Sequence, residues 1–460
     1  VVYMGTTFPG VISFAFMVSL ILLGVGLRAR IRLLQLALVP SSLIAGITGF
    51  VLINADLSFG FESSDFTAFA FHFFTLSFMS LVLTGKEPAD RGTPATSIVR
   101  GGSWLSFVWV MSLVLQGVTG IGVIILYDYL TGSELSYFLG AIATHGFTQG
   151  PGQALALGSI WEGELGIKHA VDFGLIYASA GFVAAFLIGV PIARMAISRG
   201  MNQNKSAVID EEFLSGLSLQ GREPSAGKQV THAANVDSFA FHLAILGVAY
   251  LLTDTYLRFA QGYTNDVQIG DVHLGLFFSH NLFFFHGLMV CMVLRSALDR
   301  LGLGHIIDND TQKRITGSSV DLMVVGTIMS IQFALLATYI VPILLTCLAV
   351  SLVTALLCFG FGRLLGSFSV ERAVTIFGCC TGSTGSGLLL LRILDPDFST
   401  PIAKELAFFN IAIIFLGFHV LTIMAPILPT FDLLTICTVY LGTFLVGAGL
   451  LTIANRRQWI

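Results

Sequence analysis

Two glycine-rich polar stretches interrupt the long apolar runs of this chain, and they restrict the folds that it can adopt. Residues 146–153 read GFTQGPGQ and residues 378–387 read GCCTGSTGSG, so their starts lie 232 residues apart, about half of the chain length. Backbone N–H and C=O groups without partners are costly in lipid and have to be enclosed by protein. Interruptions at corresponding positions of two chain halves are typical of the ligand-binding region of a secondary transporter.

The composition places the chain in the membrane. Hydrophobic residues make up 55% of it and charged residues only 11%, which is outside the range of soluble proteins. We therefore expect an all-α polytopic membrane protein. The net charge of -4 and the scattered basic residues argue against a nucleic-acid partner. The six cysteines lie in apolar segments or in the second glycine-rich stretch, which argues against disulfides and against a metal site.

Apolar runs of about twenty residues, long enough to cross about 30 Å of hydrocarbon, predict eleven membrane-spanning helices. The predicted spans lie near residues 9–27, 31–53, 64–85, 103–128, 172–196, 237–258, 275–296, 319–340, 342–364, 403–427 and 430–454. A polar stretch over 200–236 predicts a solvated linker that divides the chain into two halves.

The distribution of basic residues tests this arrangement, because cytoplasmic loops are enriched in Lys and Arg. We place the N-terminus outside, the C-terminus in the cytoplasm, and both glycine-rich segments as hairpins that enter and leave on one side. Then 21 of the 23 basic residues fall on the cytoplasmic side, and Lys168 and Arg258 remain outside. A full crossing at either segment would destroy this bias, so the count favours two re-entrant hairpins.

Five crossings in each half make the second half enter the membrane from the opposite side, so we expect two inverted five-helix repeats. The first hairpin, about 136–161, enters from outside, and the second, about 369–396, enters from inside. The predicted divisions are a first repeat over 1–199, a cytoplasmic linker over 200–236, a second repeat over 237–427 and an additional C-terminal transmembrane helix within 428–460.

The hairpin tips carry the chemistry that a transporter needs. A broken helix presents free N–H groups at one end and free carbonyls at the other, which suit anions and small cations respectively. The candidate substrate and ion ligands are Thr148, Gln149, Gly150, Gly152, Gln153, Thr381, Gly382, Ser383, Thr384, Gly385 and Ser386. The competing interpretation is that Gly and Ser only allow close helix packing. Their symmetric positions favour a ligand site.

Other polar residues in or near the spans are expected mainly to bond neighbouring helices or to lie at the membrane interface. They are Gln116, Asp254, His242, His280, Asn281, His286, Gln332, Asn410 and His419. Arg392 follows the second tip in sequence. Its side chain can reach an anionic substrate or extend towards the inner membrane surface, and we favour the second interpretation. The sequence places no pair of carboxylates, and no His/Glu cluster with the spacing of metal ligands, at a common depth in the membrane. This argues against an enzyme with catalytic residues.

Several motifs resemble the sodium/glutamate symporter family of bacterial secondary transporters. They are LVPSSLIAGITGF at 38–50, FHFFTLSFMSLVL at 71–83, GFTQGPGQA at 146–154 with WEGELGI at 161–167, and CTGSTGSGLLLLRILDPDF at 380–398. The chain differs from the best-known members at both tips. GFTQGPGQ stands in place of a histidine-containing tip, and GSTGSG stands in place of a proline-containing tip. It also carries the additional span near 430–454.

The resemblance implies sodium-coupled glutamate uptake across the bacterial inner membrane, with Na⁺ as the coupling ion and no other cofactor. It also implies a homodimer in which a substrate-carrying domain moves against a scaffold. Three alternatives stay open from the residues alone. These are transport of another organic anion coupled to sodium or protons, an ion channel lined by the two re-entrant loops, and a membrane enzyme.

Overall fold

The structure is a computed structural model of the whole chain. It describes residues 8–84, 95–205, 211–217, 227–232, 234–270, 272–396 and 399–456. Part of the predicted linker over 200–236 therefore lies outside the described residues. The same holds for four of the basic residues that indicated orientation, which are Lys86, Arg91, Arg222 and Arg457.

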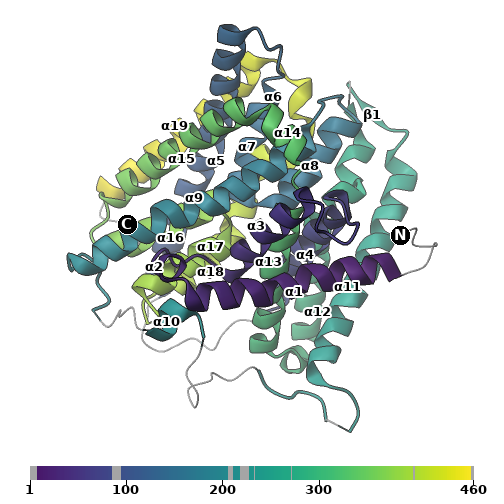
Figure 1. Cartoon of the computed structure of the whole chain (residues 1–460), viewed down its shortest axis with the longest axis vertical. Helices are drawn as coiled ribbons and strands as arrows, with labels where there is room; N and C mark the ends of the chain where they lie inside the picture. The colour runs from purple at the N-terminus through teal and green to yellow at the C-terminus, as the bar shows by residue number, and fades with distance from the viewer. Residues whose placement is uncertain are drawn as a thin grey trace. The chain divides into compact units, whose positions relative to one another are not determined.

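The described chain is almost entirely helical, as Figure 1 shows, and its only strands there form a two-stranded antiparallel sheet. In chain order the elements are α1 (Phe8–Arg30), α2 (Arg32–Leu36), α3 (Ser41–Asn54), α4 (Ser64–Leu83), α5 (Ala95–Thr131), α6 (Phe138–Ala141), α7 (Ala143–Gln149), α8 (Pro151–Gly163), α9 (Ala170–Ser198), α10 (Glu211–Ser215), α11 (Ser238–Thr264), β1 (Gln268–Ile269), β2 (Val272–His273), η1 (Leu274–Phe278), η2 (His280–Leu282), α12 (Phe283–Arg300), η3 (Gly304–Ile306), α13 (Asn309–Met329), α14 (Phe333–Thr338), α15 (Ile340–Gly362), α16 (Ser369–Thr381), α17 (Thr384–Leu394), α18 (Ile402–Leu416), the π-helical turn η4 (His419–Met424), η5 (Ala425–Thr430) and α19 (Leu433–Arg456).

Eight helices in the described part of the chain are long and apolar enough to cross a membrane. A ninth crossing results if the bent pair α18 and η4–η5 counts as one span, with a bend of 55°. The eight are Gly10–Arg30, Ser64–Leu83, Thr96–Thr131, Ala170–Ser198, Ser238–Thr264, Leu274–Arg300, Ile340–Gly362 and Leu433–Asn455. The chain is therefore an all-α, multi-pass membrane protein.

Three predicted spans are wrong as single helices. The span at 31–53 is two helices, α2 and α3, because the backbone turns at Leu38, whose φ is 50°, and Pro40 disfavours helix at the residue before it. The span at 319–340 is displaced. Helix α13 begins ten residues earlier, where the Asp308 side chain accepts a hydrogen bond from the Thr311 N–H, and it ends at Met329. The span at 403–427 bends after α18.

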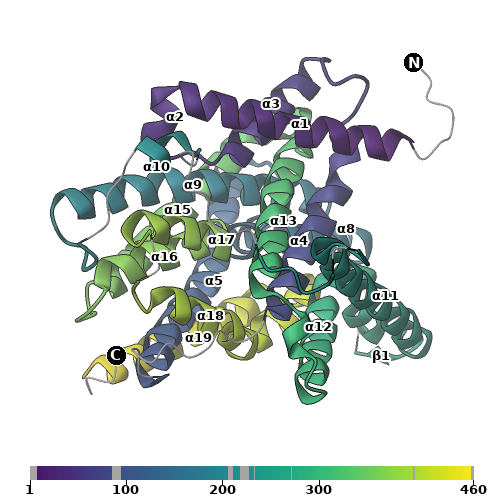
Figure 2. The ribbon, with the colours of Figure 1, turned by 90° about the horizontal axis from the view of Figure 1, so that it is seen from below.

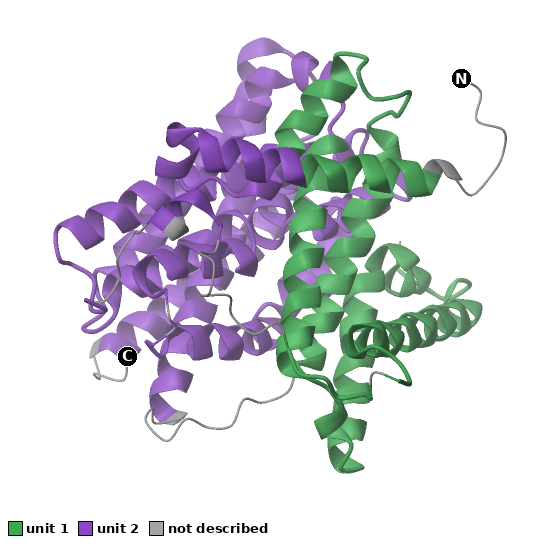
Figure 3. Cartoon of the chain, turned by 60° about the horizontal axis from the view of Figure 1, so that its bottom comes forward, with its two compact units in different colours: residues 1–21, 45–90, 218–330 green, residues 22–44, 91–217, 331–460 purple. Residues whose placement is uncertain are grey.

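The chain divides into two compact units, which Figure 3 shows in different colours. Unit 1 comprises residues 1–21, 45–90 and 218–330, and unit 2 comprises residues 22–44, 91–217 and 331–460. Each unit is thus assembled from both halves of the sequence. Unit 1 contains α4 and α11–α13, and unit 2 contains α5–α9 and α14–α19.

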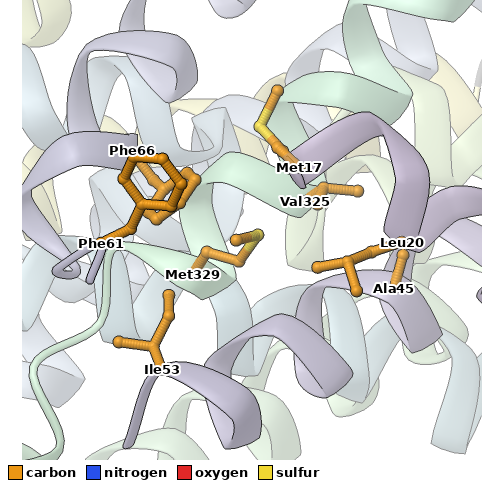
Figure 4. Close-up of a cluster of buried hydrophobic side chains, with 8 residues drawn as sticks. All are labelled: Met17, Leu20, Ala45, Ile53, Phe61, Phe66, Val325 and Met329. Carbon is orange, nitrogen blue, oxygen red and sulfur yellow. The ribbon is translucent and has the colours of Figure 1, made fainter. Parts of the chain in front are cut away.

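In unit 1, helices α4 and α13 pack along one another in opposite directions. Ser80 near the end of α4 donates to the backbone carbonyl of Gln312 near the start of α13 at 2.9 Å. At the opposite ends, Gly326 lies against the backbone of Phe66 and Ala70. Figure 4 shows one apolar cluster of this unit, formed by Met17, Leu20, Ala45, Ile53, Phe61, Phe66, Val325 and Met329.

In unit 2, the long helix α5 is the common packing partner of α6, α7, α15, α18 and α19. Its glycines allow this, because Gly120 lies against the backbone of Gly140 and Gly117 lies against the ring of Tyr440 from α19. Helix α9 packs on α16 and α17, and Figure 2 shows these three helices together. Both glycine-rich stretches therefore lie in unit 2, surrounded by long helices.

Candidate functional site

The first glycine-rich stretch contains a helix break at Gly150. Helix α7 ends at Gln149, Gly150 has φ 83° and ψ −175°, and α8 begins at Pro151. Only glycine adopts this backbone conformation without strain. Pro151 suits the first helical position because its missing N–H would have no intrahelical partner there. The sequence GPG thus ends one helix and starts the next.

The second stretch contains a break at Gly382 and Ser383. Helix α16 ends at Thr381 and α17 begins at Thr384. The two helices fold back on one another, because Gly378 packs directly on the backbone of Gly387. A methyl group at either glycine would collide with the other helix. Glycine is therefore needed here for the close approach of two backbones.

The two breaks meet inside unit 2. A Cβ atom on Gly150 would lie 3.4 Å from the carbonyl oxygen of Gly382. The Thr148 hydroxyl lies 3.5 Å from the carbonyl oxygen of Cys380. Gly181 of α9 packs against both breaks, since it touches the Thr381 carbonyl and the Cα atom of Phe147. Segments 232 residues apart in sequence thus form one locality.

This locality combines both kinds of helix end. Helices α7 and α16 present their carbonyl ends, and α8 and α17, of 13 and 11 residues, present their N-termini. Part of the carbonyl capacity is already used, because Gly378 O accepts from the N–H groups of Gly382 and Ser383 at 3.0 and 3.3 Å. The helix dipoles favour a cation at the carbonyl ends and an anion at the N-termini.

The structure brings the predicted site residues of both stretches into this locality, with different hydrogen bonding. Thr148 is buried and donates to Gln116 Oε1 at 2.6 Å. The Gln149 Oε1 atom lies 3.2 Å from His145 Nδ1, and Thr384 donates to Asn410 Oδ1 at 2.9 Å. Gly150, Gly152 and Gln153 are buried, as are Thr381, Gly382 and Ser386, and Gly385 is partly exposed.

Two of these hydroxyl groups differ in their availability to a ligand. Thr381 donates to the Phe377 carbonyl of its own helix at 2.7 Å, so its proton is already used. Ser383 Oγ is buried and has no hydrogen-bond partner among the described residues. A buried polar atom without a partner is costly unless water or a ligand satisfies it. Ser383 is therefore the predicted residue whose environment most directly indicates a ligand.

Three further residues contact the predicted ones: His145, which sequence reasoning missed, and Gln116 and Asn410, which it did not assign to the site. Gln116 and Asn410 are interhelical hydrogen bonders, as the polar residues within spans were expected to be, but nothing in their spacing indicated which partners they contact. His145 is fully buried, and its Nε2 atom has no partner among the described residues. Its spacing of four residues from Gln149 within a helix was the available signal.

Among the described residues, no group of three or more His, Cys, Asp or Glu side chains could hold a metal ion. The oxygens at the breaks are instead neutral carbonyl and hydroxyl groups. Such groups suit a hard monovalent cation better than a transition metal.

The sequence profile of the sodium/glutamate symporter family matches residues 7–387, which is more than four fifths of the chain. The chain belongs to the sodium/glutamate symporter family. Both helix breaks lie within the matched range, and α18 and α19 lie beyond it. A search of curated protein sequences finds no match to the chain. Family membership implies sodium-coupled glutamate transport, and members of the family are transporters, not enzymes.

Proposed function

We propose that this symporter carries glutamate, or a closely related acidic amino acid, together with sodium by alternating access. Both ligands bind where the two helix breaks meet. The observation that carries the proposal is the meeting of the breaks within unit 2, with Gly150 beside the carbonyl of Gly382. This arrangement places two carbonyl ends and two helix N-termini around one point, which suits a cation and an anionic substrate bound together.

The substrate carboxylates bind at the N-terminal turns of α8 and α17. Gln149, Gln153 and Ser383 give them hydrogen bonds, and the Thr384 hydroxyl does so when it leaves Asn410 Oδ1. Sodium binds at the carbonyl ends of α7 and α16. The remaining predicted residues, Thr148, Gly150, Gly152, Thr381, Gly382, Gly385 and Ser386, either line these ends or let the backbone approach the ligands. Sodium and substrate stabilise the same arrangement of the breaks, so each raises the affinity for the other.

The proposal includes two inverted repeats with re-entrant hairpins. Helix α9 begins at Ala170 and α18 begins at Ile402, and this offset of 232 residues equals that between the starts of the two glycine-rich stretches. Each compact unit takes helices from both halves of the chain, and the antiparallel packing of α4 on α13 fits an inverted relation. The hairpins correspond to α7–α8, entering from outside, and α16–α17, entering from the cytoplasm.

Unit 2 is the substrate-carrying domain in this proposal and unit 1 is the scaffold. The protein resides in a bacterial inner membrane as a homodimer, with the N-terminus outside and the C-terminus in the cytoplasm. The asymmetry of 21 basic residues against two supports the orientation. The alternative transport function is uptake of another organic anion coupled to sodium or protons, which would bind at the same two helix breaks.

Uptake into proteoliposomes tests the function. Purified protein is reconstituted, and labelled glutamate uptake is measured with an inward sodium gradient, with a proton gradient and with neither. We expect saturable accumulation only with the sodium gradient. Accumulation driven by protons alone would support the alternative coupling. Equal flux without any gradient, accompanied by a current, would indicate a channel.

The predicted site residues give a sharper test. Gln149→Ala and Thr384→Ala are each expected to lower kcat/KM for glutamate at least about tenfold, because each removes one hydrogen bond to a charged carboxylate. Thr384→Ser keeps the hydroxyl and is expected to retain most of the uptake. Thr338→Ala is the control, because the Thr338 hydroxyl bonds only the Ala334 carbonyl of its own helix among the described residues. Wild-type uptake in both alanine variants would show that the breaks serve packing alone.

A further inference from the structure

Gln116 of α5 lies at the centre of a buried polar cluster in unit 2. Its Nε2 atom is 2.8 Å from the carbonyl oxygen of Cys380, 2.9 Å from Thr354 Oγ1 and 3.1 Å from Ser112 Oγ. Its Oε1 atom accepts from the Thr148 hydroxyl at 2.6 Å. All five residues are at most 2% exposed. The cluster joins α5 and α15 to both helix breaks.

The amide nitrogen has more acceptors than it can satisfy. A primary amide has two N–H donors, and three oxygens surround Gln116 Nε2. Thr354 cannot relieve the shortage, because its own proton is donated to the Val350 carbonyl at 2.7 Å and it therefore presents lone pairs to the amide. Three oxygens that present lone pairs to one buried point would stabilise a positive charge there. In this structure the neutral NH₂ group of Gln116 occupies that point.

The surrounding charges agree with this description. Cys380 lies in the last turn of α16, whose 13 residues direct the negative end of the helix dipole at the cluster. The oxygens are hydroxyls, an amide and a backbone carbonyl, with no carboxylate among the five residues. Neutral oxygen donors suit a small monovalent cation, since divalent calcium is bound by several carboxylates.

We propose that these oxygens form a sodium site and that the ion displaces the Gln116 amide nitrogen from it. Sodium takes the oxygens of Ser112, Thr354 and Cys380 that the amide nitrogen holds in its absence, and Gln116 Oε1 and Thr148 Oγ1 complete the shell. This inference rests on the proposed symport and specifies where its coupling ion binds. The ion fixes Thr148 of the first break and Cys380 of the second at once, so sodium binding shapes the glutamate site.

The test removes single oxygens without changing the shape of the cluster. Thr354→Val deletes one hydroxyl and keeps the branched side chain, and Ser112→Ala deletes the other. The sodium concentration for half-maximal uptake is expected to rise about tenfold in Thr354→Val and about threefold in Ser112→Ala, as expected for the loss of one ligand each. The KM for glutamate at saturating sodium should stay within about twofold of wild type.

A matched control is Thr119→Val on the same helix. The Thr119 hydroxyl bonds the Leu115 carbonyl at 2.7 Å, and it is outside the cluster. This variant is expected to keep the wild-type sodium dependence. An unchanged sodium dependence in Thr354→Val and Ser112→Ala overturns the inference while leaving sodium-coupled uptake intact. If the Thr354→Val protein does not insert into the membrane, the sodium dependence of Ser112→Ala alone tests the site.

Ion binding is also measured without transport. The unfolding temperature of the purified protein is compared in sodium, potassium and choline chloride at equal ionic strength, since a ligand that binds only the folded state raises it. We expect sodium to raise the unfolding temperature of wild type and Thr119→Val, and to lose this effect in Thr354→Val. This result would support the site even if glutamate proved not to be the substrate. Equal sodium stabilisation in wild type and Thr354→Val contradicts it.

Discussion

Arg372→Ala is expected to remove nearly all correctly folded symporter from the membrane. Arg372 Nε and Nη2 donate to Glu405 Oε2 and Oε1 at 2.8 and 2.6 Å, and the side chains are 7% and 0% exposed. The pair joins the first turn of α16 to α18, and Gly101 of α5 packs directly on the carboxylate. Removing the guanidinium leaves a buried charge without its partner, which costs about 3–5 kcal/mol.

The measurement is the fraction of extracted protein that elutes as a single species, together with its unfolding temperature. Arg363→Ala, at an exposed position, is the control and should behave as wild type. The double variant Arg372→Met with Glu405→Leu is expected to recover much of the folded fraction, because replacing both charges by apolar groups is often neutral. A stable, monodisperse Arg372→Ala protein would show that this pair does not hold α16 in place.

Neither member of this pair was recognised in the sequence, and the reason is physical. Arg372 was counted only as a cytoplasmic basic residue, because a charge beside an apolar segment ordinarily faces water. Its partner is 33 residues away, across the second break. Periodicity reports which face of a helix is apolar, and it carries no information on which distant side chain meets a given charge.

The features that were predicted correctly depend on local chemistry. Glycine with positive φ at Gly150 and proline at the next position break a helix wherever they occur, so the first break falls within the predicted stretch. Long apolar helices such as α5 and α9 follow from hydropathy alone. The convergence of the Thr148, Thr354 and Cys380 oxygens on Gln116 needs the tertiary packing of α5, α15 and both breaks, which no local pattern contains.

Hydropathy also misplaced helix α13 for an understandable reason. Its first turns are polar, beginning Asn309-Asp310-Thr311, so a search for apolar runs started ten residues too late. The Asp308 side chain accepts from the Thr311 N–H at 2.9 Å and its hydroxyl at 2.8 Å, which caps the helix. A capping residue followed by a polar turn marks a helix start, and this signal outweighs hydropathy at the end of a membrane helix.

Gly181→Ala is expected to abolish sodium-driven glutamate uptake in a protein that still folds. Gly181 of α9 lies against the carbonyl of Thr381, the last residue of α16, so an added methyl group collides with backbone. A carbonyl cannot rotate away as a side chain can, and the second break has to move. Alanine favours helix over glycine by about 1 kcal/mol and overpacking costs about 1–3 kcal/mol, so the net loss of folding free energy is about 0–2 kcal/mol.

A matched pair on the same helix separates displacement of the break from simple crowding. Gly189→Ala also overpacks, but the three atoms nearest to its added methyl group all belong to the flexible side chain of Leu390, so most uptake should remain. Gly122→Ala of α5 has nothing within 4 Å and should transport as wild type. We expect the maximal uptake rate of Gly181→Ala to fall at least about a hundredfold, since misplacing a binding group by about 1 Å has such an effect on positioning. Wild-type rates in Gly181→Ala would mean that the geometry of the second break is not needed for transport, and this would remove the main support for ligand binding between the two breaks.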